Sequence, residues 1–165
     1  MPRLTAIILV ALAAIVASPT TSGARPVSLD QARRVLRASG LTTPIWFTPA
    51  LPPPYRGRPV TLTIGPGDLY LARVVARPDP NGRRSTLTFG RARVYLVDAR
   101  AFCLARGGHW RVWIRTRRRF SSCTEDGART VFFVRSDRLY DVSVDAAATI
   151  GYRALRHAAA RFAPL

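Results

Sequence analysis

Lysine is absent from this chain of 165 residues, so all 26 of its basic side chains are arginines. Acidic residues are scarce as well, and nine carboxylates leave a formal net charge of +17. A charge of this size attracts polyanions at a distance, and guanidinium groups suit phosphates, carboxylates and aromatic faces. The balance favours an anionic partner. The alternative is a GC-rich genome, which accounts for the missing lysine but not for the excess of positive charge.

Groups for acid–base catalysis are also few. His109 and His157 are the two imidazoles, and Glu125 is the single glutamate. The chain has no Gly-x-Ser-x-Gly motif, no glycine-rich phosphate loop and no zinc-ligand spacing, which excludes the enzyme classes that these motifs define. We therefore expect a non-catalytic protein without a cofactor. The alternative enzyme is a secreted phosphodiesterase or ribonuclease, in which His109 and His157 would remove and donate the proton.

Only two cysteines are present, Cys103 and Cys123. In an exported chain they most simply form one disulfide, which closes a loop of about 20 residues and stabilises the fold by roughly 3 kcal/mol. Two buried free thiols are the alternative. With His109 and His157 the cysteines would make four zinc ligands, but their spacing matches no usual zinc pattern, so we expect no metal site.

The one long apolar run, 4–17, is about 14 residues, shorter than the roughly 20 that a membrane-spanning helix needs. A cationic start precedes it and the small residues Ser22-Gly23-Ala24 follow it, a layout typical of a secretory signal peptide over 1–24. A permanent anchor is the alternative. We expect 25–165 to be a single exported domain, secreted or in the periplasm or cell envelope, with no transmembrane segment after cleavage.

Period-two alternation dominates the middle of the mature chain. Turn residues at 65–67, 78–82, 125–127 and 136–137 separate the apolar runs. The predicted strands are 60–64, 69–77, 86–89, 91–97, 110–119, 130–135 and 139–144. Segment 98–106 is ambiguous, because Asp98 either caps a short helix, which we favour, or lies in a further strand that turns at Gly107.

A helix is expected on each side of these strands. Ser28 and Gln31 have capping-box spacing and Gly40 suits a C-terminal cap, which predicts a helix over 29–39. Extended chain is expected over 42–48, and a polyproline-like connector over 49–54.

Asp145 is predicted to open a final helix that reaches Phe162, with an apolar stripe on one side and arginines on the other. Both terminal helices are expected to cover one face of the sheet. The predicted fold class is therefore α+β: an antiparallel sheet of about five to seven strands packed by an N-terminal and a C-terminal helix and held by one disulfide.

Segment 109–119 is the most suggestive local pattern, because it interleaves aromatic and apolar residues with arginines. As one strand it would turn Trp110, Val112 and Ile114 toward the core and a cationic ladder toward the other face. Such a ladder suits a phosphate-bearing polymer, with the Trp113 indole stacking on a base or sugar ring. The predicted anion-binding residues are Arg111, Trp113, Arg115, Arg117, Arg118 and Arg119. The alternatives are that Trp113 lies beneath a helix or stacks with the chain's own arginines.

These patterns predict an exported, non-catalytic basic module whose partner is an envelope polymer, an acidic protein or a nucleic acid. Besides the ribonuclease-like alternative, a structural exported protein whose charge serves only solubility is also consistent with the composition. The sequence leaves the ligand and the oligomeric state open.

Overall fold

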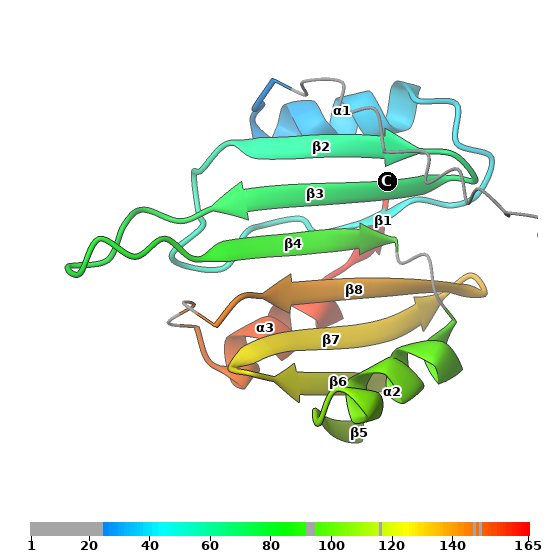
Figure 1. The fold of residues 1–165 in the computed structure, drawn as a ribbon. Coiled ribbons are helices and arrows are strands. Elements are labelled where there is room, and N and C mark those ends of the chain that lie inside the picture. The colour runs from blue at the N-terminus through cyan, green and yellow to red at the C-terminus, as the bar shows by residue number, and fades with distance from the viewer. Residues whose placement is uncertain (1–24, 92–94, 116, 147, 149) are drawn as a thin grey trace, which may run out of the picture.

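A seven-stranded antiparallel sheet forms the centre of the computed structural model, which describes residues 25–91, 95–115, 117–146, 148 and 150–165 (Figure 1). The predicted signal peptide, 1–24, lies outside the described residues. The strand order is β2-β3-β4-β8-β7-β6-β5. The strands are β2 Val60–Gly65, β3 Leu69–Val75, β4 Thr86–Arg91, β5 His109–Arg115, β6 Arg118–Glu125, β7 Ala128–Arg135 and β8 Arg138–Val144. The mixed helix-and-sheet class and the antiparallel sheet are thus confirmed.

Helices lie on both faces of this sheet (Figure 1). They are α1 Leu29–Ala38, α2 Leu96–Ala105 and α3 Tyr152–Ala160. The first and last contribute to one hydrophobic core, as Leu36 of α1 and Leu155 of α3 are fully buried in it. Residues of α2 are not part of that core, and α2 lies on the opposite face. The expected pair of terminal helices on one face is therefore present, and α2 is a third helix on the other side.

The N-terminal helix follows its capping signals. The Ser28 hydroxyl accepts a hydrogen bond from the Gln31 N–H at 3.1 Å, and Gly40 adopts a φ of +70° just after the helix ends. In the left-handed region glycine avoids the steric penalty of a side chain. The predicted helix over 29–39 is confirmed to within one residue.

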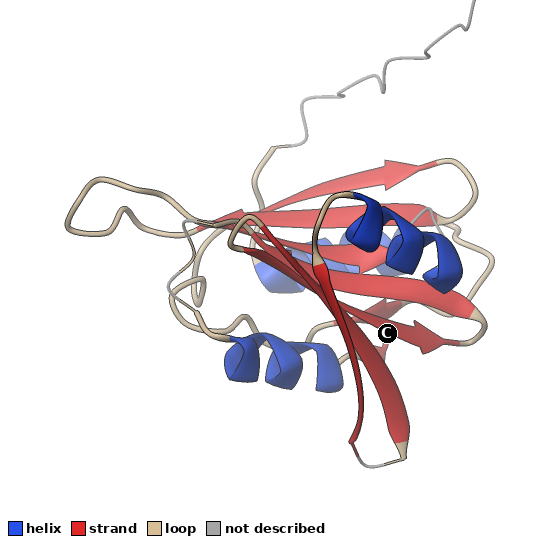
Figure 2. Ribbon diagram, turned by 60° about the horizontal axis from the view of Figure 1, so that its bottom comes forward, coloured by secondary structure: helices blue, strands red, loops and turns tan. Residues whose placement is uncertain are grey.

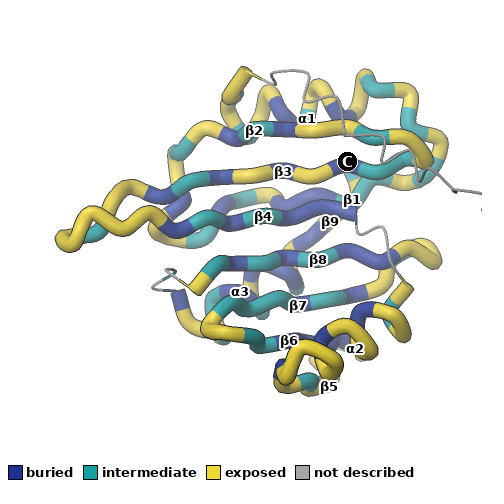
Figure 3. The backbone as a smooth tube through the Cα atoms, in the orientation of Figure 1, coloured by how far each residue is buried: buried dark blue, intermediate teal, exposed yellow. Residues whose placement is uncertain are grey.

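The core is aromatic at its centre. Phe133 packs edge-on against Phe162 at 4.9 Å between ring centroids and stacks on Tyr140 at 5.7 Å. Burial is concentrated in the middle strands, whereas most of β5 is exposed (Figure 3). The sheet therefore has a well-packed centre and one exposed end.

The C-terminal helix is shorter than predicted. It begins at Tyr152, and Gly151 before it is extended with ψ near 170°. Asp145 caps no helix, because its carboxylate accepts the Thr86 N–H at 2.8 Å and so ties the chain to β4. Glycine weakens a helix interior, so the helix does not extend from Tyr152 back through Gly151 toward Asp145. Ala147 of the predicted stripe and Thr149 of the predicted helix lie outside the described residues.

The predicted strand 91–97 is wrong in its second half. Arg91 ends β4, residues 92–94 lie outside the described part of the chain, and Leu96 already belongs to α2. The favoured helix over 98–106 is confirmed, but it begins before Asp98, with Tyr95 at the N-cap position. Its apolar residues are not gathered on one side, since Phe102 is 60% exposed, and a periodicity argument therefore could not place its start.

The predicted strand 110–119 is two strands joined by a tight turn. The strands β5 and β6 pair from His109↔Thr124 to Arg115↔Arg118, so the chain reverses between them. Arg117 lies in this turn with a φ of +61°. No glycine, proline or asparagine marks the reversal, so the local pattern predicts a single strand and is wrong here.

Two short strands at the chain's ends complete the fold. From the predicted extended segment 42–48, β1 (Trp46–Phe47) pairs with β9 (Ala163–Pro164) near the C-terminus. The backbone N–H of Leu165 also donates to the carbonyl of Ile45 at 2.9 Å. This pairing carries the chain from α3 back beneath the sheet.

The predicted disulfide is present between Cys103 of α2 and Cys123 of β6, with the sulfur atoms 2.05 Å apart. Gly108 lies against it: a Cβ atom there would be 2.8 Å from the Cys103 sulfur, too close for any side chain. The bond therefore fastens α2 to the face of β6 that is remote from α3. Within the described residues, no helix has the length and apolar character to cross a membrane.

Candidate functional site

The predicted anion-binding residues lie on the β5–β6 hairpin, which twists away from the rest of the sheet (Figure 2). Pairing between β6 and β7 stops at Phe120↔Phe133, so Arg118 and Arg119 have no partner on β7. Val134 and Arg135 pair only with β8. The residues next to the turn of this hairpin are thereby separated from β7, and this separation exposes their arginines.

The hairpin does not arrange these arginines as one continuous ladder. Arg111, Trp113 and Arg115 alternate along β5 on the face that carries α3, because Trp113 pairs with the core residue Phe120. Arg118 shares that face through its pairing with Arg115. Arg119 pairs with Ile114 and so lies on the opposite face, and Arg117 lies in the turn.

The assignment of the core face at β5 was wrong. Trp110, Val112 and Ile114 alternate as predicted, but Val112 is 46% and Ile114 74% exposed. Trp110, nearer the start of the strand, stacks on Phe132 at 5.5 Å. The reason is that α2 covers this face only near the disulfide, whereas α3 and the main core lie under the Trp113 face.

Trp113 is engaged by the protein itself. Its ring stacks on Phe120 at 5.6 Å with 11° between the planes, and the Arg156 guanidinium of α3 lies 4.4 Å from the indole centroid. This geometry matches the alternative in which the tryptophan stacks with the chain's own arginines. A base or sugar would have to compete with Arg156 for the indole face.

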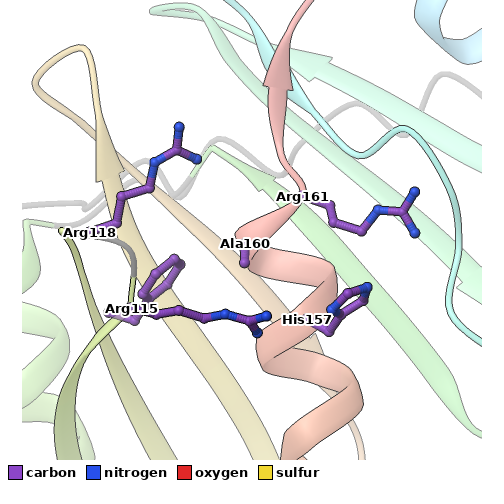
Figure 4. Close-up of a pocket in the computed structure, with 6 residues that line it drawn as sticks. Arg115, Arg118, His157, Ala160 and Arg161 are labelled. Carbon is purple, nitrogen blue, oxygen red and sulfur yellow. The ribbon is translucent and has the colours of Figure 1, made fainter.

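A cationic hollow of about 380 Å³ lies between the hairpin and the end of α3 (Figure 4). We call it the arginine hollow. The hairpin supplies Arg115 and Arg118, with Phe120 between them, and α3 and its end supply His157, Ala160 and Arg161. Figure 4 shows Arg115 extended from the strand toward α3. None of these lining residues is acidic, so the described wall carries positive charge only.

The end of α3 accounts for one of the arginines in the hollow. Arg161 is the C-cap residue of α3, where carbonyl groups make the end of the helix partly negative and favour a positive side chain. Arg115 and Arg118 come from a different element and gain nothing comparable from within the hairpin. Their approach to α3 concentrates positive charge in the hollow, and no acidic residue of the lining neutralises it.

Arg135 is a functional candidate that the sequence did not reveal. Its guanidinium lies 5.6 Å from the Trp46 ring, 5.5 Å from Phe120 and 5.1 Å from Phe133. Its Nη1 donates to the carbonyl of Val134, whereas Nε and Nη2 are buried without a hydrogen-bond partner among the described residues. Burial and the nearby charge of Arg118 lower the Arg135 pKa.

A second hollow of about 290 Å³ opens where β6 and β7 separate, and Arg118 and Arg135 both line it. Arg118 therefore borders both hollows. Trp46, which contacts Arg135, is distant from it in sequence, and no local pattern could have connected the two residues.

The two histidines lie at opposite ends of β5. His109 begins the strand and pairs with Thr124, whereas His157 lines the arginine hollow beside Arg115. Six residues of extended chain separate His109 from Arg115, roughly 20 Å. The structure thus places His157 among cations but does not bring His109 into the same hollow. In the described part of the chain, no three His, Cys, Asp or Glu residues gather as a metal site would require.

Comparisons with known proteins give no match to any protein-family model, curated protein or solved structure.

Proposed function

We propose that the mature chain is an exported, non-catalytic module that binds an anionic partner through the arginines of the β5–β6 hairpin. The observation that carries this proposal is the arginine hollow, where Arg115, Arg118 and Arg161 meet His157 with no acidic residue in the lining. Cations held together without a counter-charge repel one another, and an anion bound between them relieves that repulsion.

No ion pair of the described chain neutralises the hairpin arginines. Its ion pairs join Arg33 to Asp30, Arg91 to Asp68 and Arg106 to Glu125, and none involves a hairpin arginine. Arg91 shows how this fold satisfies a buried guanidinium: it donates to the Thr43 hydroxyl at 2.6 Å and to the Asp68 carbonyl at 3.1 Å. Among the residues that the structure describes, the hairpin arginines have no such partners, which supports an external one.

The disulfide supports export, because such bonds persist in oxidising compartments. The predicted signal peptide leads to the same compartment. The partners consistent with this location and charge are an envelope polymer, an acidic protein or a nucleic acid.

The experiment compares two triple variants of equal charge. R115Q/R117Q/R118Q removes three positive charges from the β5–β6 hairpin, and the control R77Q/R83Q/R84Q removes three from exposed arginines on the β3–β4 hairpin. Tryptophan fluorescence is titrated with RNA, a sulfated glycan and an acidic protein at about 0.15 M salt, where exposed charges further apart than roughly 8 Å are largely screened. We expect the hairpin variant to bind about tenfold or more weakly, with a salt slope reduced by about 3, and the control to stay within about twofold.

Equal losses in the two triple variants would show that net charge alone attracts polyanions, which contradicts the proposal. RNA integrity is checked in the same samples. Cleavage by the parent that disappears in H109A/H157A would establish the ribonuclease-like alternative in place of a non-catalytic module.

A further inference from the structure

The outer edge of β5 is open. This strand ends the seven-stranded order, and no strand of the described chain pairs with its other side. At the opposite end of the sheet, Val27 closes part of β2: its N–H donates to the Val60 carbonyl at 2.9 Å, and the Val60 N–H returns a bond of 2.7 Å. The edge of β5 has no such closure over its seven residues, a length of roughly 23 Å.

The register identifies the backbone groups that this edge presents. In a hairpin with a two-residue loop, the pair next to the loop is hydrogen-bonded, and bonded pairs then alternate with non-bonded ones. Arg115↔Arg118 is the pair next to the loop. The N–H and C=O groups of residues 109, 111, 113 and 115 therefore point to β6, and those of Trp110, Val112 and Ile114 point outward.

Side chains along the same edge alternate between charge and apolar surface. Arg111 and Arg115 lie on the α3 face, while Val112 and Ile114 are exposed on the other face. Proteins usually protect a long edge with charges, bulges or proline. In β5 the register is unbroken, there is no proline, and the charges lie on one face only. An added strand would meet cations on one side and apolar side chains on the other.

Charge determines which strand fits. A second copy of β5 would place arginines beside arginines, and directly opposed like charges destabilise a strand pair. Two chains of net charge +17 also repel before they meet. A strand that alternates acidic and aliphatic residues would instead pair carboxylates with Arg111 and Arg115 and cover Val112 and Ile114.

We infer that the edge of β5 binds an acidic polypeptide segment in extended conformation, which adds to the sheet as an eighth strand beside it. This inference rests on the proposed function, because the hairpin arginines supply the charge recognition. The main-chain groups of Trp110, Val112 and Ile114 supply the additional affinity that distinguishes strand addition from electrostatic attraction.

The test separates main-chain pairing from charge. The probe is a fluorescently labelled synthetic peptide that alternates Glu and Val, measured by anisotropy with the mature protein. Val112→Pro removes one outward N–H without touching the β5–β6 bonds, since proline is tolerated where the N–H of an edge strand faces solvent. Val112→Thr keeps both the N–H and the β-branched shape and is the matched control.

We expect V112P to weaken peptide binding about tenfold and V112T to change it less than about twofold. A second arm leaves the protein unaltered: the same peptide with N-methyl groups on alternate residues keeps its charge but cannot pair along its backbone. It should bind about tenfold more weakly than the parent peptide.

Equal binding of V112P and V112T, with no effect of N-methylation, would overturn strand addition while leaving the proposed function intact. A loss of binding in R115Q/R117Q/R118Q that the β3–β4 control reproduces would instead contradict the proposed function. RNA or a sulfated glycan that binds more tightly than the peptide at about 0.15 M salt, and equally to V112P, would identify the partner as a polymer other than polypeptide and overturn this inference.

Discussion

Two hairpins of this protein carry exposed arginines, and they differ in what surrounds them. The β3–β4 hairpin projects with Arg77, Arg83 and Arg84, whereas β5–β6 carries Arg115, Arg117, Arg118 and Arg119 (Figures 1 and 2). In the first, the Asp79 carboxylate accepts the N–H groups of Asn81 and Arg83, so its acidic group closes its own turn. In the second, Arg115 and Arg118 face cations from α3. A similar number of arginines thus gives a solvated loop in one place and a concentrated positive site in the other.

The turns of the two hairpins also differ in the residue at their left-handed position. Where the chain needs a left-handed residue, the β3–β4 hairpin uses Gly82, with a φ of +75°, and β5–β6 has Arg117 with a φ of +61°. A large side chain in that region is strained, typically by 1–3 kcal/mol. The β5–β6 turn therefore keeps an arginine where a glycine would be less strained, which lowers the stability of the turn.

The largest loss of stability is expected from C103A/C123A, because the disulfide anchors only one of the two hairpins. Cys123 lies in β6 and holds it to α2, while β3 and β4 have strand partners on both sides. We expect a loss of about 3 kcal/mol in the free energy of unfolding, seen as a fall of about 10 °C in Tm. In amide hydrogen exchange, α2, β5 and β6 should lose more protection than β3 and β4. Equal loss across all strands would contradict a local anchor.

A second predicted change in stability should affect both hairpins equally, because it arises at Asp141 in β8, which lies between them in the sheet. Asp141 pairs with Gly90 of β4 and Phe132 of β7, and burial raises its pKa to about 7. The folded state therefore holds a proton that the unfolded chain releases near pH 4, so stability falls as pH rises from about 4 to 7 and is level above.

Asp141→Asn removes this ionisation. We expect it to raise the free energy of unfolding by about 4 kcal/mol at pH 8, since the pKa is raised by about three units at about 1.4 kcal/mol each, and to leave it nearly unchanged near pH 4, as measured by urea unfolding across that range. Binding of RNA or of the acidic peptide should match the parent, because Asp141 lies in neither hairpin. A parent stability that stays level between pH 4 and 7 would contradict the raised pKa.

Much of the fold followed from local patterns, and the exceptions have physical causes. Alternating residues predicted β2, and the capping residues predicted α1. Most of strand β6 was not predicted, because its centre is Ser121 and Ser122. Such small polar residues are typical of turns, but here each is only 2% exposed. Burial of such residues depends on the helices and strands that cover them, which a local pattern does not contain.

The contacts around the arginine hollow could be predicted only in part, for the same reason. Arg115 and Arg118 were identified as anion-binding candidates because they lie close together in sequence. The sequence does not connect His157 or Arg135 with the hairpin, because both residues are far from the hairpin residues that they approach in the fold. The face of β5 that contacts the core was assigned wrongly, since hydrophobicity alone does not show that the end strand extends past α2.

The smallest effect is expected from a variant that moves one arginine from one hairpin to the other without changing the net charge. This variant gives the sharpest comparison of the two hairpins. The double variant R117G/G82R places glycine in the β5–β6 turn and arginine at the left-handed position of the β3–β4 turn. Each exchange should alter the free energy of unfolding by about 1 kcal/mol in opposite directions, so the double variant keeps nearly the parent stability. A Cβ at Gly82 would meet no atom within 4 Å, so the new side chain has room.

Affinity should not be kept. Relative to the parent, we expect the double variant to bind RNA or the acidic peptide about threefold more weakly and to show a salt slope reduced by about 1, measured by fluorescence titration at several salt concentrations. The single variant G82R is the control and should bind no better than the parent, although it carries one more charge. If the double variant binds as the parent does, the position of an arginine is immaterial and the two hairpins are equivalent. If it binds more weakly at equal charge, the backbone strain at Arg117 is compensated by what that residue contacts in a partner.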